Sequence, residues 1–149
     1  MYKRKKGVSI SKAKRFTYNG VEYKSGLEVY MAKILTEEGL YFRYEGVTFN
    51  LQDSFDYGNE YWERQSNGKG EFSKRSSGVR SITYVPDFVG EGFIIETKGY
   101  ANESFPIKYK IFKNLIKDLD VVLYKPQIQS ECDKTLKQIL SKEIWKSVK

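Results

Sequence analysis

Apolar side chains recur at helical spacing in three segments of the chain. The first runs from Ser25, a favourable N-cap residue, to Gly39, which marks a helix end. A second helix is expected to begin near Pro106, which suits a first helical turn, and a third to span about residues 133–148. The residues expected to face inward are Leu27, Tyr30, Met31, Ile34 and Leu35 in the first helix, Ile107, Ile111, Leu115 and Leu119 with Phe112 and Ile116 beside them in the second, and Leu136, Ile139, Leu140, Ile144 and Val148 in the third.

Short β-prone runs fall between these helices. Asn19-Gly20 lies between two such runs in residues 15–24 and predicts a tight hairpin. Residues 52–80 are polar with scattered aromatics, which leaves a twisted hairpin excursion and a mobile loop as alternatives. The other expected strands are residues 41–51, broken at Gly46, residues 81–89 and 93–97, joined at Gly90-Glu91-Gly92, and residues 121–125, buried on both faces at the centre of a sheet.

The order of these elements, roughly α-β-β-β-α-β-α, predicts an α/β fold in which a central mixed sheet is flanked by helices. A chain of 149 residues is expected to form one domain. We expect a basic N-terminal arm with the short hairpin at residues 1–24. The main domain is then residues 25–149, with residues 52–80 as an insertion.

Two features of the composition limit the chemistry. The chain has no histidine and a single cysteine, Cys132, which excludes a Ser-His-Asp triad, an internal disulfide and the usual zinc sites. A bound metal would need oxygen ligands, which favours magnesium, manganese or calcium. No apolar run approaches the roughly 20 residues of a membrane span, and the N-terminus lacks the apolar segment of a signal peptide. We therefore expect a cytoplasmic protein.

Positive charge is concentrated near the N-terminus. The formal net charge is +7, and residues 1–15 hold seven basic side chains and no acidic one. Such an arm favours a polyanion, commonly nucleic acid, although a solvated tail is the alternative. The residues expected to contact DNA are Lys3, Arg4, Lys5, Lys6, Lys12, Lys14 and Arg15 in the arm, with Lys108, Lys110 and Lys113 on the second helix.

An acid and a base follow the most apolar of the expected strands. Glu96 and Lys98 come directly after it, and alternation along a strand puts both on one face. If the neighbouring strands pair, Asp87 comes close to Glu96, and the repulsion between two carboxylates favours a divalent cation such as Mg²⁺. The backbone carbonyl of Thr97 is a further candidate ligand, and Lys98 would orient a water or balance charge on a phosphate. This set predicts phosphodiester hydrolysis, and the alternative is a salt bridge on a solvated sheet face.

Glu28 permits two interpretations. Ser25-Gly26-Leu27-Glu28 has the spacing of a capping box, in which Glu28 accepts a hydrogen bond from the Ser25 amide. Glu28 also lies at the border of the apolar stripe, where a helix presents a carboxylate toward a sheet edge. From these residues alone, the helix cap is the favoured interpretation of Glu28.

Three short motifs, SGLE, PDF and ETKG, occur in this order and resemble the PD-(D/E)XK nuclease superfamily. Longer stretches, SGLEVYMAKILTEEGLYFRYE and YVPDF…FIIETKG, resemble the phage endonuclease I family of Holliday-junction resolvases, over about residues 24–125. The resemblance implies a restriction-endonuclease-like sandwich and a homodimer that cuts branched DNA in a phage-infected host cell. It further implies that Glu28, Asp87 and Glu96 bind two Mg²⁺ or Mn²⁺ ions and that Lys98 assists the attacking water.

The chain departs from that family in two places. Residues 52–80 and the arm before Ser25 are longer than the matching segments, which leaves the shape of the DNA substrate open. Other PD-(D/E)XK phage nucleases of nicking, restriction-like or homing type therefore remain alternatives. So do a non-catalytic DNA-binding protein on the same fold and a structural or host-interaction protein. The aromatics of residues 55–62 and Tyr100 are candidates either for DNA contact or for packing.

Overall fold

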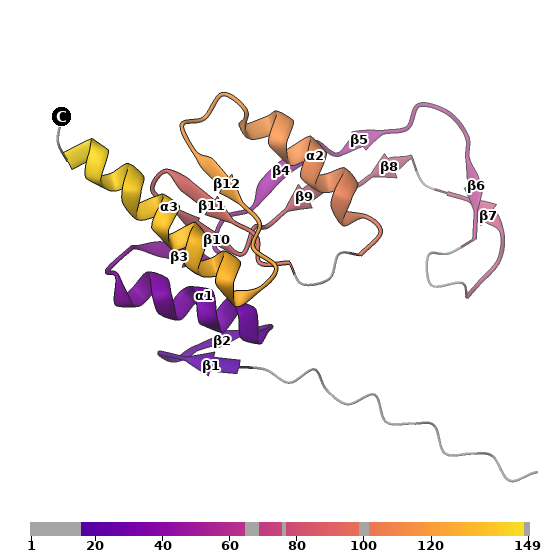
Figure 1. Cartoon of the computed structure of the whole chain (residues 1–149). Coiled ribbons are helices and arrows are strands. Elements are labelled where there is room, and N and C mark those ends of the chain that lie inside the picture. Colours follow the sequence, from indigo (N-terminus) through magenta and orange to yellow (C-terminus); the bar gives the residue numbers. More distant parts are fainter. Residues whose placement is uncertain (1–15, 65–68, 76, 99–101, 148–149) are drawn as a thin grey trace, which may run out of the picture. The chain divides into compact units, whose positions relative to one another are not determined.

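The chain forms a mixed α/β structure (Figure 1), and its internal contacts divide it into two units. The computed structural model describes residues 16–64, 69–75, 77–98 and 102–147, of which 143–147 are described by their backbone alone. The first unit takes in residues 1–41, 97–99 and 124–149, and the second takes in residues 42–96 and 100–123.

The first unit begins with the predicted hairpin. Strands β1 (Phe16–Tyr18) and β2 (Val21–Tyr23) pair antiparallel, with Tyr18 opposite Val21. Asn19 and Gly20 both adopt positive φ, 48° and 75°, as a two-residue turn of the mirror-image type requires. The hairpin prediction is therefore confirmed.

Two helices complete the first unit. Helix α1 (Gly26–Glu37) is capped by Ser25 and is followed by Gly39 at φ 72°, as predicted. It packs on α3 (Gln129–Ser147), where the Tyr30 hydroxyl donates a 2.7 Å hydrogen bond to Asp133. Inward residues behave largely as expected. Met31, Leu35 and Ile139 are buried, and Leu27, Tyr30, Ile34, Leu136 and Leu140 are half-buried. The side chain of Ile144 and all of Val148 lie outside the described residues.

The second unit is built on a mixed sheet of order β12-β11-β10-β3. Its strands are β3 (Phe42–Tyr44), β10 (Phe88–Gly90), β11 (Phe93–Ile95) and β12 (Val122–Tyr124), the last of which crosses into the first unit at Tyr124. The prediction that residues 121–125 form a central strand buried on both faces is wrong. β12 is an edge strand of this sheet, and all three of its residues are half-buried.

The expected strand at residues 81–89 is two strands. β9 (Ile82–Tyr84) pairs with β4 (Phe49–Gln52), whereas β10 pairs with β3 and β11. Pro86 stands between them, and proline cannot donate to a sheet ladder. The predicted interruption of residues 41–51 is confirmed, because β3 ends before Gly46 and β4 begins after it.

Helix α2 (Phe105–Ile116) buries a different face from the predicted one. Ile107, Ile111, Leu115 and Leu119 are exposed, and the core of the unit is instead formed by Tyr84, Ile94, Phe105, Tyr109, Phe112 and Ile116. Steps of four residues drift by about 40° each around a helix, so the predicted stripe winds off a single face. The observed spacing of four, three and four residues stays on one face, and it buries the larger aromatic rings.

The described parts of residues 52–80 pair in antiparallel strands, which favours the hairpin alternative. Beyond β4–β9, the strands β5 (Phe55–Asp56) and β8 (Gly78–Val79) pair antiparallel, followed by β6 (Trp62–Glu63) and β7 (Ser73–Lys74) (Figure 1). We call residues 55–79 the aromatic arm, of which 65–68 and 76 are not described.

None of the helices within the described ranges is long and apolar enough to cross a membrane.

Candidate active site

Asp87 and Glu96 come together because a hairpin fixes the register of their strands. β10 and β11 pair with Phe88 opposite Ile95 and Gly90 opposite Phe93. Gly92, at φ 76°, closes the turn between them. Continuing this register by one position puts Asp87 opposite Glu96, and opposed side chains in an antiparallel pair are close neighbours. The structure therefore unites two of the predicted site residues within the second unit.

Both carboxylates are buried. Asp87 is 8% exposed and Glu96 is 4% exposed, so neither belongs to a salt bridge on a solvated sheet face. Burying a carboxylate is costly unless hydrogen bonds or charges compensate. The hydroxyl of Tyr84 compensates at Glu96, where it donates a hydrogen bond of 2.5 Å to Oε2. Among the described residues, no buried side-chain nitrogen or oxygen lacks a hydrogen-bond partner.

Tyr84 is a site residue that the sequence did not reveal. It lies on β9, which pairs with β4, and its 7%-exposed ring belongs to the core cluster. The available signal was a tyrosine in an apolar strand next to Pro86-Asp87, because a buried phenol needs a partner for its hydroxyl.

The acids impose a clear electrostatic effect on the tyrosines around them. Burial first, and then the hydrogen bond to Glu96, raise the pKa of Tyr84 above its ordinary value. Burial also raises the pKa of Tyr109, to about 12, with the negative charge of Glu96 as the second cause. Both phenols are consequently protonated at neutral pH, and Tyr84 keeps its proton to donate to the Glu96 carboxylate.

Glu28 serves as a helix cap in the first unit. The Ser25 hydroxyl accepts a hydrogen bond from the Glu28 amide at 3.2 Å, as a capping box requires. The Glu28 carboxylate accepts from the backbone amide of Lys24 at 3.0 Å, one residue earlier than the predicted Ser25 amide. Glu28 is buried despite its charge, so the cap also holds a carboxylate in a sheltered position.

Thr97 and Lys98 also belong to the first unit. β11 ends at Ile95, two residues short of the predicted strand end. Thr97 is buried, and the backbone amide of Lys98 donates to the carbonyl of Pro126 at 3.1 Å. The structure thus groups Glu28, Thr97 and Lys98 in one unit and Asp87 and Glu96 in the other.

The chemistry of Asp87 and Glu96 suits a hard divalent cation, since carboxylate oxygens are the ligands that Mg²⁺ and Mn²⁺ take in proteins. Two such ligands are sufficient for Mg²⁺, which keeps several of its waters. In the described part of the chain, no group of three or more histidine, cysteine, aspartate or glutamate residues is placed to hold a metal ion. Of the predicted metal ligands, Asp87 and Glu96 are therefore the two that lie opposite one another within one unit.

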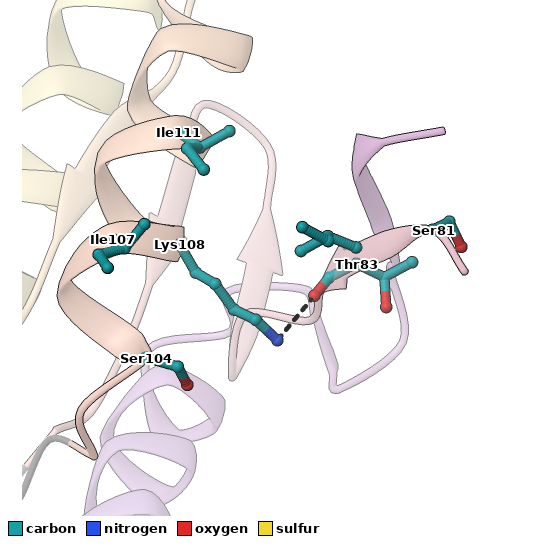
Figure 2. Close-up of a pocket in the computed structure, with 7 residues that line it drawn as sticks. Ser81, Thr83, Ser104, Ile107, Lys108 and Ile111 are labelled. Carbon is teal, nitrogen blue, oxygen red and sulfur yellow. Dashed lines mark hydrogen bonds between the residues drawn. The ribbon is translucent and has the colours of Figure 1, made fainter. Parts of the chain in front are cut away.

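Of the predicted lysines of α2, Lys108 lines a cavity of about 360 Å³. Figure 2 shows this cavity between Ile107 and Ile111 of α2 and Ser81 and Thr83 at β9. The Lys108 ammonium donates to the Thr83 carbonyl at 3.4 Å across it. Lys110 and Lys113 are exposed, and the Lys113 ammonium lies 4.9 Å above the centre of the Tyr109 ring.

Most of the other residues predicted to contact DNA are not described by the structure. The basic residues of the N-terminal arm, Lys3, Arg4, Lys5, Lys6, Lys12, Lys14 and Arg15, lie outside the described residues, as does Tyr100. The aromatics of residues 55–62 lie on or between the strands of the aromatic arm. Compared with known proteins, the chain matches no family model, no curated protein and no solved structure.

Proposed function

We propose that this protein is a metal-dependent, structure-selective DNA endonuclease with a restriction-endonuclease-like sandwich. The observation that carries the proposal is the pair of buried carboxylates, Asp87 and Glu96, opposite one another at the end of a hairpin. Structural proteins rarely bury two acids side by side, because like charges in a sheltered site repel. A bound cation would offset the repulsion between the two carboxylates.

Each residue of the predicted set has a role in this proposal. Asp87 and Glu96 would hold Mg²⁺ or Mn²⁺, and the family resemblance adds Glu28 and the Thr97 carbonyl as candidate ligands. When bound, the cation lowers the pKa of a water molecule and offsets the charge of the phosphate. The ammonium of Lys98 would orient that water or balance charge on the attacked phosphate. Tyr84 would hold the Glu96 carboxylate in one orientation by its hydrogen bond.

The basic side chains would supply the DNA affinity. Seven basic residues in the N-terminal arm and the lysines of α2 would neutralise phosphates, which makes binding strongly dependent on salt. The substrate we propose is a four-way junction in phage-infected cytoplasm, cut by a homodimer with one site for each opposed strand.

The test is cleavage of a labelled four-way junction and a matched linear duplex, with Mg²⁺, with Mn²⁺ and with a chelator. We expect cleavage of the junction only when a metal is present. Glu96→Gln should lower the cleavage rate at least ~10²-fold while junction binding in the chelator is retained. Asp87→Asn and Lys98→Ala should behave in the same way.

The matched control is Glu91→Gln, which makes the same change at an exposed residue of the same hairpin. It should cut as fast as the unaltered protein. Binding without cleavage in either metal would instead identify a non-catalytic DNA-binding protein, and equal cutting of junction and duplex would rule out structure selectivity. Undiminished cutting by Glu96→Gln would remove the acidic pair from the chemistry.

A further inference from the structure

The aromatic arm exposes large rings that its own fold does not cover. Phe55, Tyr57, Trp62 and Phe72 are all exposed, the last two at 51% and 65%. A two-stranded ribbon has no second layer to pack against, so rings on it stay in contact with water unless a partner covers them. None of these four residues belongs to the core cluster of the second unit.

The rings at the far end of the arm are held in place. Trp62 on β6 and Phe72, which directly precedes β7, stack on one another, with ring centroids 6.0 Å apart and ring planes inclined by 29°. The indole nitrogen of Trp62 donates a 2.8 Å hydrogen bond to Glu60, which limits rotation of its ring. The contacts of these two rings restrict their orientation, so little side-chain freedom is lost when a partner binds.

Charge on the arm is balanced, unlike charge on the chain. Residues 55–79 hold four basic and four acidic side chains, whereas the whole chain carries a formal net charge of +7. Two of the basic residues make long ion pairs, Lys74 with Glu60 at 3.9 Å and Arg75 with Glu63 at 3.8 Å. Such exposed pairs are weak, so their cations can exchange to a phosphate.

A basic side chain lies opposite one of these rings. The strand register puts Lys74 directly opposite Trp62, so an ammonium accompanies the ring. Proteins that bind single strands use this combination, because bases stack on the rings while their phosphates pair with nearby cations. We propose that the aromatic arm binds unpaired bases of DNA by stacking them on Trp62 and Phe72. This deepens the proposed function, on which the choice of DNA rests, and it names unpaired bases near a branch as the feature that the protein recognises.

The experiment measures binding alone, in a chelator, so it does not depend on cleavage. A labelled single-stranded oligonucleotide and the same sequence as a blunt duplex are titrated with the full chain at several salt concentrations. Trp62→Ala and Phe72→Ala should each weaken single-strand binding about tenfold or more, and duplex binding far less. The slope of affinity against salt should not change, because rings release no counterions. Trp62→Tyr, which keeps a stacking ring, should retain most of the affinity.

Two measurements make the result specific. Tyr41→Ala removes a ring outside the arm that is even more exposed, at 77%, and should leave binding unchanged. In a Trp145→Phe background Trp62 is the only tryptophan, so its fluorescence should be quenched by the single strand and not by the duplex. Unchanged single-strand affinity of Trp62→Ala with Phe72→Ala would overturn the proposal. So would a change from dimer to monomer in these variants, since the arm would then bind a second copy of the chain. Either result leaves the cleavage test, and the proposed function, standing.

Discussion

Replacing Tyr84 by phenylalanine removes one hydroxyl from the interior and leaves the ring among its aromatic neighbours. That hydroxyl donates to the Glu96 carboxylate at 2.5 Å, and the two residues are 7% and 4% exposed. A hydrogen bond to a charged group contributes about 1.5–3 kcal/mol, and its loss leaves a buried acceptor less well satisfied. We therefore expect the free energy of unfolding to fall by about 2 kcal/mol.

Urea denaturation of the metal-free protein at neutral pH is the direct assay, with an unchanged dependence on urea as the sign that only stability has altered. For a chain of this size, a loss of about 2 kcal/mol corresponds to a melting temperature lower by about 4–8 °C. The matched control is Tyr124→Phe. Tyr124 is half-buried on β12, and its hydroxyl has no hydrogen-bond partner among the described residues. This substitution should cost less than about 0.5 kcal/mol.

The same variant tests whether Tyr84 positions a metal ligand. Outer partners of ligating carboxylates typically change metal affinity by about 10–100-fold. Titration calorimetry with Mn²⁺, without DNA, should therefore show weaker binding by Tyr84→Phe and unaltered binding by Tyr124→Phe. Loss of stability with unchanged Mn²⁺ affinity would show that the hydrogen bond is structural. Equal stability of Tyr84→Phe and the unaltered protein would refute the reasoning at its first step.

Two further predictions concern the packing of each unit. Gly90→Ala would bring a methyl group within 2.1 Å of the Phe93 ring across the β10–β11 pair, and this overpacking should lower the free energy of unfolding by about 1–3 kcal/mol in the same urea assay. A melting curve that does not move would contradict that contact. Cys132 is buried against α1, and burial raises the pKa of its thiol to about 11, so alkylation at pH 8 should be slow in the folded protein and fast in denaturant. Labelling at the same rate in both states would show an accessible thiol.

Local signals predicted the first unit well. The Asn19-Gly20 turn needs two residues at positive φ, and Ser25 and Gly39 mark the ends of α1 by hydrogen bonding and by backbone freedom. Each of these features is decided within a few residues of chain. Tertiary packing therefore changes neither the turn nor the ends of α1.

Packing choices were harder to predict where apolar residues exceeded what the core could cover. Helix α2 offers two candidate stripes, and the aromatic one is buried while Ile107 and Ile111 line an open cavity beside β9 (Figure 2). Residues 121–125 are apolar enough for a central strand, yet β12 occupies a sheet edge with its side chains half-buried. The sequence shows which residues are apolar enough to be buried. Which of them are buried in fact depends on the order of the strands in the sheet and on how the helix packs.

Within the candidate site, one contact was predictable from the sequence and another was not. The strands next to Asp87 and Glu96 are joined by the short turn Glu91-Gly92, and this turn fixes the register that buries Phe93. Their proximity was therefore predictable from sequence. Tyr84 reaches Glu96 only because β9 leaves the hairpin at Pro86 and pairs with β4, more than thirty residues earlier in the chain. A tyrosine beside Pro86-Asp87 indicates a buried phenol that needs a partner, but the identity of that partner depends on the distant β4–β9 pairing, which has no local signature.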